Sequence, residues 1–162
     1  MDKLLNQLRY IKAGAICMFF ALCGNLFKGD ALNNWYTQLR LPPFTLPVIY
    51  FFAMGFIFYF ICGVLLYKLF SEENNKNETV FLITLVIIMM AYYTIWDLVF
   101  FGLKSPMAGF FCLYTIHLIC VLYLLQVRQI IPSYINSLSA IYWMAWLCIL
   151  LADQLVDLKL LI

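Results

Sequence analysis

Charged residues are scarce in this chain of 162 residues. They make up 11% of it, against about 25% in a typical soluble domain. Ten Lys and Arg and eight Asp and Glu give a net charge of +2. That balance lacks the basic excess with which proteins bind nucleic acids, so we expect no nucleic-acid partner. Apolar residues reach 66% and the mean hydropathy is +0.95, which excludes a soluble enzyme and a disordered chain.

Patterns that carry catalysis or hold metal ions are missing as well. The sequence has one histidine, His117, and neither an HExxH motif nor a CxxC pair. It shows no nucleophile–base pair, so we expect no catalytic residues, although an enzyme stays open as the less favoured class. A buried, hydrogen-bonded histidine explains His117 more simply than a haem ligand does. The six cysteines fall in apolar stretches and suit packing better than disulfides or metal binding. We expect no metal site and no required cofactor.

Long apolar runs between the charged residues are what the sequence has in abundance. A helix needs about 20 apolar residues to cross the bilayer core, and five runs approach that length. We therefore predict an all-α integral membrane protein, a bundle of five transmembrane helices, in which residues 1–162 form a single domain within the lipid bilayer. The predicted helices cover about residues 11–28, 47–69, 79–103, 105–127 and 131–153.

Lys and Arg are unevenly divided between the two sides that five spans define. The side with the N-terminus carries six of them and the opposite side carries four. Because cytoplasmic loops are enriched in Lys and Arg, this division predicts a cytoplasmic N-terminus.

One face of the predicted second helix combines small and aromatic residues. Pro47, Phe51, Gly55, Tyr59 and Gly63 follow one another at intervals of four residues, which places them on one side of a helix. Two glycines on that side permit close approach of a neighbouring backbone or of a ligand. Helix packing and a cavity wall are compatible interpretations of this face.

The four tryptophans fall in one half of the membrane. Trp35 lies between the first two predicted helices, and Trp96, Trp143 and Trp146 lie near the ends of the third and fifth helices on the same side. An interfacial belt would place tryptophan at both membrane faces. The asymmetry therefore favours an aromatic-walled cavity on the side of Trp35.

Acidic residues lie on that side too. Asp97 and Asp153 come near the ends of the third and fifth helices, and an acid at the edge of a span indicates a functional role. Snorkelling towards water is the alternative explanation. We hypothesise that Arg40, between the first two helices, pairs with Asp97 or Asp153 when this segment closes as a lid.

Two segments resemble the TspO/MBR family, the tryptophan-rich sensory proteins and translocator proteins. The first runs from Trp35 to Gly63 (WYTQLRLPPFTLPVIYFFAMGFIFYFICG), and the second, WDLVFFGLKSP, from Trp96 to Pro106. The resemblance implies a membrane protein that binds a flat apolar ligand, such as a porphyrin or other tetrapyrrole, haem or a sterol. It implies a sensory, regulatory or translocation role, with a tetrapyrrole-degrading enzyme or a small-molecule transporter as alternatives.

The chain departs from the family pattern at several positions. The family's tryptophan in the second helix falls on Gly55, its third-helix asparagine on Tyr93 and its fourth-helix aspartate on Cys112. We interpret the chain as a divergent member, expect a bacterial cytoplasmic membrane with the mitochondrial outer membrane as the alternative, and leave a homodimer open. The candidate ligand-binding residues are Trp35, Tyr36, Pro42, Pro47, Phe51, Gly55, Tyr59, Tyr93, Trp96, Phe100, Tyr142 and Trp146.

Overall fold

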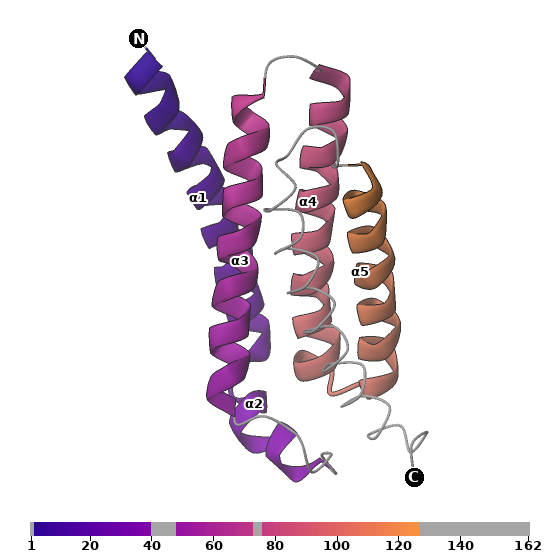
Figure 1. Cartoon of the computed structure of the whole chain (residues 1–162). Coiled ribbons are helices and arrows are strands. Elements are labelled where there is room, and N and C mark those ends of the chain that lie inside the picture. Colours follow the sequence, from indigo (N-terminus) through magenta and orange to yellow (C-terminus); the bar gives the residue numbers. More distant parts are fainter. Residues whose placement is uncertain (1, 40–47, 73–75, 127–162) are drawn as a thin grey trace.

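The computed structural model describes residues 2–39, 48–72 and 76–126, and most of these residues are helical (Figure 1). The described ranges contain no strand, which confirms the predicted all-α class. The long helices are α1 (Asp2–Lys28), α3 (Val48–Ser71), α4 (Lys76–Asp97) and α5 (Pro106–Gln126). The shorter elements are α2 (Ala31–Asn34), the 3-10 helix η1 (Tyr36–Gln38) and the π-helix η2 (Leu98–Gly102).

The long helices correspond to the first four predicted spans, and the predicted span 131–153 lies outside the described residues. The main difference is at the start of α1, which begins at Asp2 and not near residue 11. Residues 2–12 contain neither proline nor glycine and are rich in Leu, Lys, Gln and Arg, which favour helix. The sequence prediction located the apolar span, whereas the helix continues beyond it into polar sequence.

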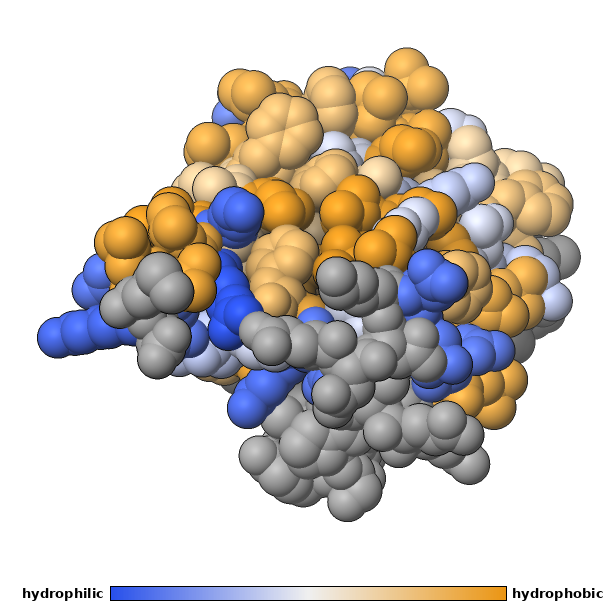
Figure 2. Space-filling model, turned by 90° about the horizontal axis from the view of Figure 1, so that it is seen from above, coloured by the Kyte–Doolittle hydropathy of each residue, from blue (hydrophilic) through white to orange (hydrophobic). Residues whose placement is uncertain are grey.

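Several of these helices meet the requirements for crossing a membrane. Within the described residues, Lys3–Lys28, Asn77–Gly102 and Pro106–Gln126 are long and apolar enough to do so, and Gly55–Ser71 is a shorter apolar helix. Much of the surface visible in Figure 2 is hydrophobic. Among the described residues, large apolar side chains such as Phe56 and Leu26 are exposed. Lipid explains this exposure, because an integral membrane protein has apolar solvent on its sides.

Helix α4 holds the bundle together. It packs against α1, α3 and α5, and α1 also packs along α3. Figure 1 shows α4 between α3 and α5. Its buried residues include Val86, Met89, Met90 and Trp96, so α4 presents apolar side chains to neighbours on more than one side. The N-terminal part of α1 diverges from the other helices (Figure 1).

The connection after α1 brings aromatic residues to the end of the bundle where α4 ends. Gly29 has a positive φ of 46° and its N–H donates to the carbonyl of Asn25 at 3.3 Å, a glycine-terminated helix end. Helices α2 and η1 follow. Helix α2 contacts both η1 and η2. This end of the bundle therefore carries the tryptophan-containing connection and the last turn of α4 together.

Candidate functional site

Aromatic side chains from the connection, α4 and η2 form one continuous cluster. Trp96 stacks on Phe100 with ring centroids 5.3 Å apart and planes at 8°. Trp35 meets Phe100 edge-on, also at 5.3 Å, and Tyr36 does so at 6.2 Å. Tyr93 lies 5.7 Å from Trp96. These separations fall within the range that aromatic pairs prefer, so the structure brings five of the sequence-selected residues into mutual contact.

Two further rings in the cluster were missed by the sequence analysis. Phe58 stacks on Tyr93 at 4.4 Å, and Phe101 meets both Tyr36 and Trp96 edge-on at 6.0 and 5.5 Å. Selection by intervals of four residues could not find Phe101, because Phe100 and Phe101 are adjacent in sequence. Both are buried since they belong to the π-helix η2, whose wider turn departs from α-helical spacing.

The rings of the cluster cover one another. Tyr36, Tyr93, Trp96 and Phe100 are each at most 3% exposed, whereas Trp35 is half-buried at the edge. The indole N–H of Trp96 is buried and has no hydrogen-bond partner among the described residues. An unsatisfied buried donor is costly, so a polar acceptor beside Trp96 would be stabilising.

A groove of about 860 Å³ runs between α1 and α3. Gly55 and Tyr59, two of the sequence-selected residues, line it. Tyr59 also reaches the aromatic cluster, where its ring meets Tyr93 edge-on at 6.0 Å. A Cβ atom at Gly55 would lie 3.9 Å from the hydroxyl of Tyr93. The groove and the aromatic cluster are therefore neighbours that share Tyr59.

A buried ion pair lies at the same end of the bundle. Nζ of Lys28 is 3.2 Å from Oδ1 of Asp97, and the Asp97 side chain is 1% exposed. Gly24 makes this possible, because a Cβ there would lie 2.5 Å from Oδ2 of Asp97. That Cβ would also lie 3.7 Å from the hydroxyl of Tyr59. This hydroxyl is buried and has no hydrogen-bond partner in the described ranges. The pair joins α1 to α4 beside the aromatic rings.

The hypothesised lid pair involves residues that the structure does not describe. Asp97 is placed, but Arg40 and Asp153 lie outside the described residues, so that hypothesis stays a prediction. Lys28 was not predicted to be the partner of Asp97. Also outside the described residues are Pro42, Pro47, Tyr142 and Trp146, and the side chain of Phe51 on α3.

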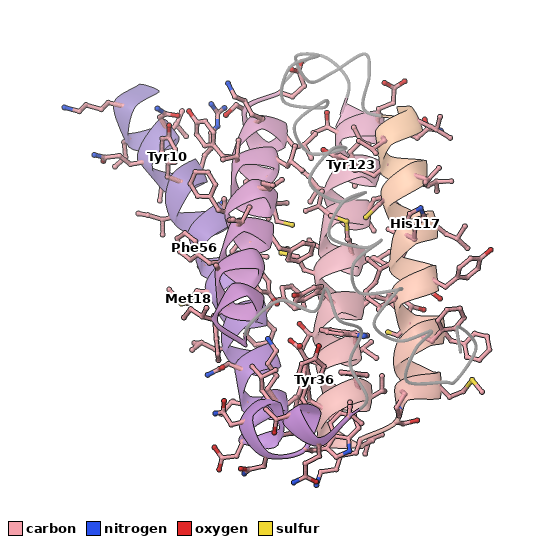
Figure 3. The ribbon with its side chains drawn as sticks, turned by 60° about the horizontal axis from the view of Figure 1, so that its bottom comes forward. Tyr10, Met18, Tyr36, Phe56, His117 and Tyr123 are labelled. Atoms are coloured by element: carbon pink, nitrogen blue, oxygen red, sulfur yellow. The ribbon has the colours of Figure 1, made fainter. Side chains whose placement is uncertain are left out.

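His117 and several cysteines also lie in the described helices. His117 lies on α5 (Figure 3), and its Nδ1 is buried without a hydrogen-bond partner in the described part of the chain, so the expected hydrogen-bonded histidine stays a prediction. Cys17, Cys62 and Cys112 are buried and unbridged. No group of three or more His, Cys, Asp or Glu within the described ranges could hold a metal ion.

Comparison with known proteins identifies the family. The model of the TspO/MBR family matches residues 13–153. The chain is 25% identical over 109 residues to a tryptophan-rich protein TspO from Archaeoglobus fulgidus, covering 65% of this chain and 67% of that protein. It is also 25% identical over 131 residues to a tryptophan-rich protein TspO from Chlorobaculum tepidum, covering 81% and 82% of the two chains. The family match extends over most of the chain, which therefore belongs to the TspO/MBR family and is a TspO-type integral membrane protein.

Proposed function

We propose that this protein binds a flat apolar ligand, such as a porphyrin or other tetrapyrrole, haem or a sterol, in an aromatic pocket beneath α2 and η1. Its role would be sensory, regulatory or translocating. The observation that carries the proposal is the continuous cluster of Trp35, Tyr36, Tyr93, Trp96 and Phe100 at one end of the bundle. Indole and phenol faces stack well on planar ring systems.

Access to these rings requires movement of the connection after α1. Tyr36 lies against Phe100 and Phe101, so displacement of η1 would uncover the faces of rings that now stack on one another. A ligand ring would replace the contacts between protein rings. An acceptor on the ligand, such as a carboxylate or hydroxyl oxygen, would satisfy the N–H of Trp96. Arg40 would close over the ligand in the hypothesised lid pair.

The test is a titration of detergent-solubilised protein with protoporphyrin IX, followed by quenching of tryptophan fluorescence and by porphyrin absorbance. We expect saturable quenching with unchanged absorbance. Trp35→Leu removes an aromatic at the edge of the cluster and should weaken binding up to about tenfold, the equivalent of one aromatic pair. The matched control is Phe111→Leu, an exposed aromatic on α5, which should bind porphyrin as the unmodified protein does.

Two results would contradict the proposal. One is quenching that does not saturate, and the other is equal affinity of the Trp35→Leu and Phe111→Leu variants. Loss of porphyrin absorbance under illumination, reduced in Trp35→Leu, would instead support the tetrapyrrole-degrading alternative.

A further inference from the structure

The groove between α1 and α3 has a floor of small residues and walls of large ones. We call it the α1–α3 groove. Figure 3 shows Tyr10, Met18 and Phe56, three of its residues, along the side of the bundle where α1 and α3 lie. The floor consists of Ala13, Gly14, Cys17, Ala21, Gly55 and Gly63, and the walls include Met18, Leu22, Phe52, Phe56 and Phe60. The wall residues are exposed, so this groove opens towards the lipid.

The groove is long and narrow. Its lining residues on α1 extend from Tyr10 to Lys28, which spans roughly 27 Å at the helical rise. That length approaches the thickness of a bilayer's hydrocarbon core, about 30 Å. Spread along it, the volume of about 860 Å³ leaves a mean cross-section of roughly 30 Å². This shape suits an extended hydrocarbon chain better than a flat ring system.

The two ends of the groove differ in charge. Within the described ranges, Lys28 and Lys68 are the charged residues that line it, and Lys28 is paired with Asp97 at 3.2 Å. Lys68 is exposed in the last turn of α3, and among the residues that the structure describes no acidic side chain lines the groove. The preceding residue, Tyr67, stacks on Tyr10 with ring centroids 3.9 Å apart, and this contact joins α3 to α1. The Lys68 end therefore offers a cation at a helix end, at the level where lipid headgroups lie.

We propose that the α1–α3 groove binds an anionic phospholipid, with the acidic headgroup at Lys68 and one acyl chain along the glycine floor towards Gly55. A phospholipid combines the two features that the groove matches, a charge at the membrane surface and a chain of hydrocarbon-core length. This inference goes beyond the proposed function, since it concerns a different ligand, although the groove shares Gly55 and Tyr59 with the candidate ligand-binding residues.

The experiment measures lipid adducts of purified protein by native mass spectrometry in a neutral detergent. Phosphatidylglycerol and phosphatidylcholine with identical acyl chains are titrated in parallel, so that only the headgroup differs. We expect one saturable phosphatidylglycerol adduct, with affinity about fivefold or more above that for phosphatidylcholine, the contribution of one Lys near the surface. Lys68→Gln should abolish this preference, whereas Lys12→Gln, an exposed lysine of α1 outside the groove, should keep it.

A second pair of variants tests the floor. A Cβ at Gly14 would meet nothing within 4 Å, so Gly14→Leu should add side-chain volume to the lining of the groove and reduce adducts of both lipids at least fivefold. Ala15→Leu is the matched control, because Ala15 is the next residue, is exposed and does not line the groove. Unchanged adducts in Gly14→Leu, equal affinity for the two lipids, or several equivalent adducts without saturation would each overturn the proposal. Protoporphyrin quenching should stay unchanged in Gly14→Leu, which separates this test from that of the proposed function.

Discussion

At the scale of single residues, the carboxylate of Asp97 is a charged group buried inside the described bundle. An ionised carboxylate removed from water is stable only when it is paired or hydrogen-bonded. Lys28 supplies that pairing at 3.2 Å, and its long apolar stem lets it reach the acid from the end of α1. Gly24 supplies the space, because any side chain there would meet Oδ2 of Asp97. The three residues thus form a single unit that fixes α1 against α4.

This unit predicts a non-additive result in a double-mutant cycle. Lys28→Met leaves Asp97 buried and unpaired, which should lower the free energy of unfolding by about 3–5 kcal/mol. The double variant Lys28→Met/Asp97→Leu removes both charges and should recover most of this loss, since apolar replacements of a buried pair are often neutral. Unfolding in SDS, followed by tryptophan fluorescence, measures both. Lys12→Met, at an exposed position of α1, is the control and should change little. A double variant no more stable than Lys28→Met would show that the two charges do not depend on each other.

The sequence places Lys28 and Asp97 on the same side of the membrane but does not identify them as partners. Their contact depends on how closely α1 approaches α4 at Gly24, and neither helix encodes that distance in its own periodicity. The same reasoning explains why Phe58 was missed, since its burial against Tyr93 depends on the packing of α3 against α4. Trp35, Tyr36, Trp96 and Phe100 were selected because they stand in the two segments that resemble the TspO/MBR family and because chain topology brings them to one end of the bundle.

At the scale of elements, the π-helix η2 decides which rings reach the site. The amide of Leu103 donates to the carbonyl of Leu98, five residues earlier, at 2.8 Å. Such a turn contains one more residue than an α-helical turn would. It allows the adjacent residues Phe100 and Phe101 both to be buried, with Phe101 in contact with Tyr36. Single π turns occur frequently at functional sites, and here the π turn adds one ring to the aromatic cluster.

Deletion of Val99 should convert η2 into α-helix and rotate the residues after it. Either Phe101 or Gly102 would then leave its present position, and the contact between Phe101 and Tyr36 would be lost. We therefore expect the free energy of unfolding to fall by about 1–3 kcal/mol, as for other changes of shape in a protein core. The tryptophan emission maximum should shift to the red, because Trp96 and Trp35 lose covering rings. Val99→Ala keeps the number of residues and is the control. An unchanged emission spectrum and melting temperature in the deletion variant would show that the π turn does not position these rings.

Elements differ in how readily the sequence reveals them. The long helices α1, α3, α4 and α5 follow from apolar run length, because lipid requires internally hydrogen-bonded backbone. The short elements α2, η1 and η2 were not predicted. They contain few residues and depend on contacts with one another, such as Tyr36 against Phe101, which run length does not report.

At the scale of the whole molecule, distribution of residue types carries more information than their abundance. The apolar content predicts a membrane protein, and the described helices together with the family match confirm it. The aromatic content divides into exposed rings such as Phe56 and Phe60, which suit a lipid environment, and the buried cluster beneath η1. If the chain has the five predicted spans, Lys and Arg are likewise divided unequally, with six on the side of the N-terminus and four on the other.

This difference of two Lys and Arg residues predicts the orientation of the protein in the membrane. With five spans, a cytoplasmic N-terminus places the C-terminus on the opposite side. A fluorescent-protein fusion should then be bright at the N-terminus, and an alkaline phosphatase fusion should be active at the C-terminus. Lys3→Gln/Lys12→Gln removes the margin and should give a mixture of both orientations, as judged by the two reporters. Asp2→Asn is the control, because acidic residues contribute little to orientation, and it should leave the reporters unchanged. Both termini on one side would contradict the five spans themselves, whereas a uniform inverted orientation would contradict only the charge argument.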